Sequence, residues 1–175
     1  MFGLLTVLVH LLATTTEAAG MEHLGSIFIR NNLETYLYLW SVQKNDGPLY
    51  TINPKAEDYQ ESWKPTIEDT GISLKIATEN DKRDVLQFEY SILHSILYWD
   101  LSSINLKGDS EIVRRGFSAT PDIHDCAAVK CNPGDEKCPD VYQKPDDDHA
   151  VRGCPANVSI VLNIGVEMRN DWYMC

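Results

Sequence analysis

The chain has 175 residues, 43% of them hydrophobic, and a formal net charge of −11 that comes from 26 acidic residues against 15 Lys and Arg. A charge this negative disfavours nucleic acid and anionic membrane surfaces as partners, because long-range repulsion opposes both, although its simplest role is to keep a protein soluble. The length suits a single domain that buries its own core.

The first 18 residues have the composition of a secretory signal peptide. An apolar run from Phe2 to Ala13 is followed by small residues, and cleavage after Ala18 or after Gly20 satisfies the small-x-small rule. No Lys or Arg precedes the run, so only the amino terminus supplies positive charge there. The run is also shorter than the roughly 20 apolar residues of a membrane-spanning helix. We therefore expect a secreted mature chain of residues 19–175, which carries a charge of −10 because Glu17 is removed.

Short runs of β-branched and aromatic residues dominate residues 25–105. Each run is about five residues long, as strands are. Turn-forming segments rich in Gly, Pro, Asn and Asp separate several of them. Strands of this length at this spacing predict an antiparallel β-sandwich. The expected strands are 26–30, 35–42, 49–52, 71–78, 85–90 and 96–101.

Residues 107–156 have a different composition, with prolines interleaved among cysteines and few apolar runs. We predict a long cysteine-rich loop region that belongs to the same domain. A last strand is expected at 158–164, and residues 165–175 form a C-terminal tail.

All five cysteines lie in the last third of the chain. In an exported protein, Cys126, Cys131, Cys138 and Cys154 are expected to form two disulfides, for which three connectivities are open. Cys175 is the odd cysteine, either free or in an intermolecular bond. A zinc site is the weaker alternative, because zinc sites usually use closer cysteine pairs.

Three polar motifs suggest sites of modification or chemistry. Asn157-Val-Ser159 is the N-glycosylation sequon of the chain and is usable if the start of the last strand is exposed. Asp146-Asp-Asp-His149 offers hard oxygen ligands, but it lacks the Gly and distal Glu of an EF-hand loop and reads better as a solvated turn. His124 near Cys126 does not predict a nucleophile pair, because a disulfide-bonded cysteine cannot attack. We expect no metal and no cofactor.

Several segments together resemble the Blastomyces yeast-phase-specific protein family, small secreted fungal proteins with a thaumatin-like fold. The segments that carry the resemblance are 27–32, 38–42, 47–48, Tyr59-x-Glu61, 71–76, 87–90, 98–105 and 145–149. Thaumatin-like chains commonly bridge a cysteine after the first strand to one in the last strand. Leu33 and Ile164 stand at those places here, so the resemblance implies that this bridge was lost as a unit.

The resemblance also implies a cleft lined by carboxylates and an Arg, which in thaumatin-like proteins is associated with binding β-1,3-glucan and occasionally with weak glucanase activity. Glu89 and Asp100 match two of the acidic positions, whereas Asn105 stands at a third and Lys75 at the Arg position. Two carboxylates about 5–10 Å apart could hydrolyse a glycoside. The simpler interpretation is that Glu89 is a solvated strand residue and that Asp100 caps a turn.

Tyr36, Tyr38 and Trp40 alternate along one expected strand. Their rings could stack on sugars, but packing in a sandwich core explains the same pattern. The leading functional hypothesis is a secreted thaumatin-like interaction protein, antigen or effector-like factor without catalysis, whose partner is a cell-wall polysaccharide or a host or cell-surface protein. The alternative is a carbohydrate-active protein that binds or weakly hydrolyses β-1,3-glucan with Glu89 and Asp100.

Overall fold

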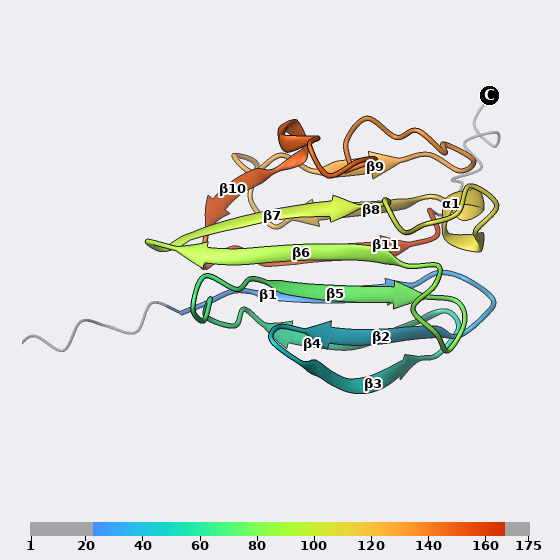
Figure 1. The fold of residues 1–175 in the computed structure, drawn as a ribbon, viewed down its shortest axis with the longest axis horizontal. Coiled ribbons are helices and arrows are strands. Elements are labelled where there is room, and N and C mark those ends of the chain that lie inside the picture. Colours follow the sequence, from blue (N-terminus) through green and yellow to red (C-terminus); the bar gives the residue numbers. More distant parts are fainter. Residues whose placement is uncertain (1–22, 167–175) are drawn as a thin grey trace, which may run out of the picture.

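The computed structural model describes residues 23–166, which fold into two packed β-sheets (Figure 1). The six-stranded sheet has the order β10-β7-β6-β5-β2-β3, and the five-stranded sheet has the order β4-β1-β11-β8-β9. All strand pairs are antiparallel except β1 with β11. The predicted all-β sandwich is confirmed.

The six-stranded sheet faces the viewer in Figure 1. Its strands are β2 (Leu37–Val42), β3 (Asp46–Ile52), β5 (Ile72–Ala77), β6 (Leu86–Leu93), β7 (Ile96–Ser102) and β10 (Arg152–Pro155). Behind it lie β1 (Ser26–Asn31), β4 (Ala56–Ser62), β8 (Phe117–Pro121), β9 (Val129–Cys131) and β11 (Ile160–Ile164). A short helix, α1 (Glu111–Arg115), and a 3₁₀ turn, η1 (Asp148–Ala150), complete the elements. Within the described range no helix is long and apolar enough to cross a membrane.

The core lies between the sheets because apolar side chains recur at every second strand position, and this period brings them to one face. In β6, for example, Leu86, Phe88 and Tyr90 are buried. Phe88 stacks on Trp99 of β7 with a centroid distance of 5.4 Å. Gln87 and Glu89, which alternate with these buried residues along β6, therefore reach the outer face of the sheet.

Two sequence predictions about the strands were wrong. Residues 107–156 are not all loop, since α1, β8, β9, η1 and β10 lie there. β4 was not predicted at all, and β3 begins at Asp46, so that Pro48 lies within a strand. The reason is that pairing with a neighbour makes a strand even where the apolar alternation is weak; Pro48 is tolerated because β3 is an edge strand.

The cysteines of the loop region pair as Cys126–Cys154 and Cys131–Cys138, one of the three open connectivities. Leu33 and Ile164, which stand where related folds carry a bridge, are both buried in the core. The backbone N–H of Asn32, the residue before Leu33, donates a hydrogen bond of 2.8 Å to the Ile164 carbonyl. Apolar packing therefore occupies this position. The expected signal peptide and Cys175 lie outside the described residues.

Candidate functional site

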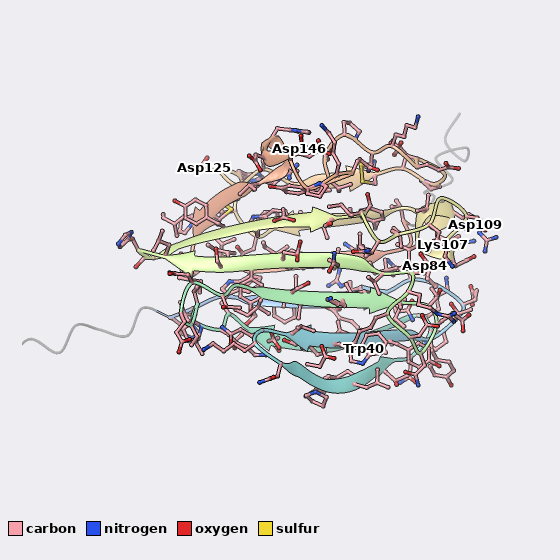
Figure 2. All side chains as sticks on the ribbon, in the orientation of Figure 1. Trp40, Asp84, Lys107, Asp109, Asp125 and Asp146 are labelled. Atoms are coloured by element: carbon pink, nitrogen blue, oxygen red, sulfur yellow. A yellow bond between two sulfur atoms is a disulfide. The ribbon has the colours of Figure 1, made fainter. Side chains whose placement is uncertain are left out.

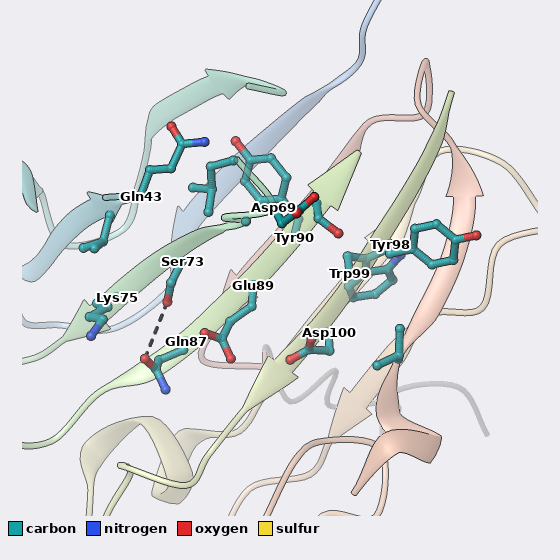
Figure 3. A pocket seen from close by; sticks show the side chains of 15 residues that line it. Gln43, Asp69, Ser73, Lys75, Gln87, Glu89, Tyr90, Tyr98, Trp99 and Asp100 are labelled. Carbon is teal, nitrogen blue, oxygen red and sulfur yellow. Dashed lines mark hydrogen bonds between the residues drawn. The ribbon is translucent and has the colours of Figure 1, made fainter. Parts of the chain in front are cut away.

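The outer face of the six-stranded sheet carries an open cleft of about 480 Å³ that crosses β2, β5, β6 and β7 and ends at Val151 (Figure 3). Three of the four candidate residues from the sequence line it: Lys75, Glu89 and Asp100. Asn105 does not line the cleft. Its Oδ1 accepts a hydrogen bond of 3.4 Å from the side-chain amide of Gln87, which does line the cleft. The sheet thus brings the four positions to one region, with the exposed Asn105 beside the cleft lining.

Strand register places the two carboxylates directly opposite each other. Glu89 of β6 pairs with Asp100 of β7, and both side chains point to the outer face (Figure 3). Directly opposed residues of antiparallel strands have Cβ atoms about 4.5–5.5 Å apart, and like charges at such positions are destabilising. No salt bridge to either carboxylate is present among the described residues. The pair therefore has no salt-bridged partner in residues 23–166, and two ionised carboxylates at these positions would destabilise the fold.

The environment of Asp100 favours its neutral form. Burial, followed by the negative charge of Glu89, raises the pKa of Asp100 to about 7, and Arg152 opposes the shift. Its Oδ1 is inaccessible and accepts no hydrogen bond from the described residues. The interpretation of Asp100 as a turn cap is wrong, because the residue lies inside β7.

Polar side chains of β5 and β6 form the cleft floor beside the carboxylates. Ser73 Oγ donates to Gln87 Oε1 over 3.5 Å (dashed line in Figure 3). Lys75 pairs in register with Gln87 and makes no salt bridge among the described residues. The floor therefore combines hydrogen-bond donors with the acceptors Glu89 and Asp100.

Arg152 is the charged residue of this region that the sequence did not reveal. It lies on β10 opposite Trp99, with its guanidinium carbon 5.5 Å from the centre of the Trp99 ring. Its side chain is only 12% exposed and donates to the carbonyls of Asp140 and Ala150. Arg152 thus fixes the cysteine-rich segment to the sheet at the edge of the cleft. The position of Arg152 beside the cleft depends on the formation of β10, and the sequence predicted a loop at residue 152.

Tyr142 joins the same segment to β7. Its backbone N–H donates 2.9 Å to the carbonyl of Leu101, and its hydroxyl donates 3.4 Å to Asp148. Burial and the negative charges of Asp100, Asp148 and Glu89 raise the pKa of Tyr142. The cysteine-rich segment therefore lies close to the carboxylate pair.

The aromatic residues of β2 do not form a sugar platform around Trp40. That indole is only 8% exposed and packs against Ala77 and Val85. Lys82 Nζ covers the ring of Trp40, labelled in Figure 2, at 5.3 Å from its centre. Tyr36 is exposed but lies outside β2. Packing, the alternative interpretation, accounts for Trp40.

The acidic segment next to η1 has a structural role for one of its residues. Asp147 Oδ2 accepts hydrogen bonds from the backbone N–H groups of Gln143 and Lys144, at 2.9 and 3.2 Å. These bonds lower the pKa of Asp147, whereas Asp146 is exposed at the surface (Figure 2). Asp147 therefore closes a turn, a role that Asp often has because its side chain accepts hydrogen bonds from nearby backbone N–H groups. Cys126 is disulfide-bonded, so it forms no nucleophile pair with His124.

Replacing Asp100 by Asn should flatten the pH dependence of stability between about pH 4 and 7. With a pKa of about 7 in the folded state and about 3.9 when unfolded, Asp100 holds its proton only in the folded protein over this range. The free energy of unfolding of the wild-type protein should thus fall by about 1–3 kcal/mol as the pH rises from about 4 to 7. The variant should not show this decrease. Urea unfolding at several pH values measures it. The exposed Asp109→Asn variant is the control, and parallel curves for wild type and Asp100→Asn would contradict the prediction.

Asn157 should carry an N-glycan when the protein is secreted from a eukaryotic host. It is exposed in the turn between β10 and β11. Digestion with an N-glycosidase should lower the mass of the secreted protein, and Asn157→Gln should have no mass to lose. An unmodified wild-type protein would show that the sequon is not used.

Comparison with known proteins agrees with this architecture. The chain is 41% identical over 141 residues, 81% of each chain, to a secreted thaumatin-like protein calA from Emericella nidulans. It is 32% identical to an antigenic thaumatin-like protein from Arthroderma benhamiae, over 89% of this chain and 79% of that protein. These relatives confirm the prediction of an extracellular thaumatin-like protein.

Among solved structures, the protein elicitor MoHrip2 from Magnaporthe oryzae is similar in fold. Its TM-score is 0.67 at 20% identity, covering 81% of this chain and 99% of the elicitor. The family model of the Blastomyces yeast-phase-specific protein matches residues 14–165. The chain therefore belongs to the Blastomyces yeast-phase-specific protein family.

Proposed function

We propose that this extracellular protein is a non-catalytic recognition protein that binds its partner in the cleft on the outer face of the six-stranded sheet. The observation that carries the proposal is the opposed pair Glu89 and Asp100, which faces the cleft without a counter-ion from the described residues. A ligand that donates hydrogen bonds would supply what the fold does not. The relative named as antigenic agrees with a role in recognition.

The donors and acceptors of the cleft favour a polyhydroxylated ligand over an apolar one. The carboxyl groups of Glu89 and Asp100 accept hydrogen bonds, whereas Lys75 donates them. A cell-wall polysaccharide offers both kinds of group along its length. Binding rather than hydrolysis is favoured because Asn105 replaces the third acid that the family resemblance implies and is directed to Gln87 instead of the cleft.

A polymer-binding assay tests the proposal. The mature protein would be incubated with insoluble β-1,3-glucan, chitin and cellulose, and both retained protein and released sugar would be measured. Retention on one polymer should fall at least tenfold in Glu89→Gln and Asp100→Asn, and no sugar should be released. Asp109→Asn removes an exposed carboxylate beside α1 that does not line the cleft, and it should bind as wild type.

The other outcomes separate the alternatives. Sugar release that both cleft variants abolish would contradict the non-catalytic role and support a glucanase. Retention that the cleft variants do not change would show that the cleft is not the binding surface. A failure to bind any polymer would reject polysaccharide as the ligand and direct the search to a host or cell-surface protein.

A further inference from the structure

A second hollow, of about 300 Å³, lies on the outer face of the five-stranded sheet. It is lined by Arg30, Asn32, Ser118, Asn163, Gly165 and Val166. Because the two sheets pack face to face, this hollow and the cleft open on opposite sides of the sandwich. None of the proposed functions above uses it.

Strand register builds a polar row through the hollow. Arg30 of β1 pairs with Asn163 of β11, Asn163 with Ser118 of β8, and Ser118 with Lys130 of β9. Three strand spacings make the row about 14 Å long. It begins and ends on a cation, with an amide and a hydroxyl between them.

The groups of the row have hydrogen-bonding capacity to spare. Asn163 and Ser118 are half-buried, and their side chains make no hydrogen bond within the described part of the chain. Arg30 uses its Nε for Glu57 at 2.9 Å, which leaves both Nη groups of the guanidinium for a ligand. Half-buried polar groups of this kind gain most from a ligand that pairs with them.

The backbone at the edge of the hollow admits only glycine at residue 165. Gly165 has a φ of +82°, and a Cβ there would lie 2.8 Å from Leu33 Cδ2. The side-chain amide of Asn32 donates 2.8 Å to the Gly165 carbonyl and so occupies the acceptor that would otherwise face an incoming anion. The lining therefore offers the donor groups of Arg30, Asn163 and Ser118 beside the acceptor oxygens of the last two.

Charge in this region is opposite to that of the cleft. No carboxylate lines the hollow, and Lys55 Nζ lies 2.7 Å from the Asn32 carbonyl at its rim. Glu57 and Glu34 pair with Arg30 and Lys55 respectively. Arg30, Lys55 and Lys130 together with Glu57 and Glu34 give this region a local charge of +1, in a chain whose net charge is −11.

We propose that this hollow binds an oxyanion, a phosphate or carboxylate group carried on a glycan. The two Nη groups of Arg30 suit the paired oxygens of such an anion, with Asn163 and Ser118 donating to the same group. A glycan is favoured over an anionic membrane because the net negative charge of the protein opposes approach to a whole charged surface, whereas a single anion can enter the hollow.

Titration of the ¹⁵N-labelled mature protein with inorganic phosphate at constant ionic strength tests the site. The amide signals of Ser118, Asn163 and Gly165 should shift together and saturate. Arg30→Gln and Asn163→Asp should weaken binding at least tenfold. Glu57→Gln frees Nε and should tighten binding severalfold, a gain that damage to the fold would not produce. Asp100→Asn changes only the cleft and should leave phosphate binding unaltered, so this test is independent of the proposed function.

A second arm identifies the source of the anion. Phosphorylated mannan should retain the protein in an Arg30-dependent way, and vesicles of phosphatidylserine and phosphatidylcholine should not. Arg30-dependent vesicle binding would overturn the assignment to a glycan. Scattered, non-saturating shifts, or equal binding by Asn163→Asp and wild type, would overturn the site itself.

Discussion

Glu61→Ala is expected to lower the free energy of unfolding by about 2–4 kcal/mol, because three buried hydroxyl groups lose a charged hydrogen-bond acceptor. Glu61 of β4 is 11% exposed, and its Oε2 lies 2.6 Å from Lys64 Nζ. Its Oε1 accepts from Ser41 Oγ at 3.2 Å and from the Tyr90 hydroxyl at 3.1 Å, and its Oε2 accepts from the Tyr59 hydroxyl at 2.9 Å. Removing the carboxylate leaves three hydroxyls without this acceptor, whereas the half-exposed Lys64 ammonium keeps Ser41 Oγ at 2.8 Å.

This network joins the two sheets, because Glu61 and Tyr59 belong to β4 and Tyr90 belongs to β6. Burial and the charge of Glu61 raise the pKa of both tyrosines, so they remain neutral donors. Tyr90 lies in a strand of the cleft, but its side chain is only 3% exposed and points between the sheets. The variant should therefore lower stability without removing a side chain that a ligand in the cleft could contact.

Urea unfolding measures the loss, with Glu57→Ala as the matched control on the same strand. Glu57 is 46% exposed in its pair with Arg30, and loss of an exposed pair costs about 1 kcal/mol or less. Glu61→Gln should fall between the two, since an amide replaces only part of the acceptor capacity. A loss of no more than about 1 kcal/mol for Glu61→Ala would contradict the account of the network.

Removing the Cys126–Cys154 disulfide by a double alanine substitution should cost about 3–4 kcal/mol, and removing Cys131–Cys138 about 2 kcal/mol. The difference follows from loop length, since the first bridge spans a sequence separation of 28 and the second one of 7. Cross-linking more distant residues removes more entropy from the unfolded chain.

The first bridge should also affect the cleft. Cys154 lies on β10, which pairs only with β7 and carries Arg152. Loosening this edge strand would disturb the guanidinium that lowers the pKa of Asp100. Each double variant would be unfolded without reductant and assayed for ligand retention. Equal losses of stability, or a greater loss for the shorter loop, would contradict the entropic argument.

Strong alternation made much of the fold predictable. The strands that became β1, β2, β5, β6, β7 and β11 place apolar residues on every second position, and burial of that face is a local demand of the sequence. β4, with the sequence Ala-Glu-Asp-Tyr-Gln-Glu-Ser, carries no such signal. It forms because β1 offers an open edge and because Glu61 finds its partners across the sandwich.

The candidate site was likewise predictable only in part from the sequence. The sequence by itself determined that the chain is a β-sandwich with a disulfide-bonded C-terminal region, and motif resemblance selected Glu89 and Asp100. Only the tertiary structure decided that these two carboxylates oppose each other, that Arg152 stands behind them, and which cysteines pair. The physical reason is that side-chain period is a local property of the chain, whereas register, sheet order and the burial that shifts a pKa depend on contacts between residues distant in sequence.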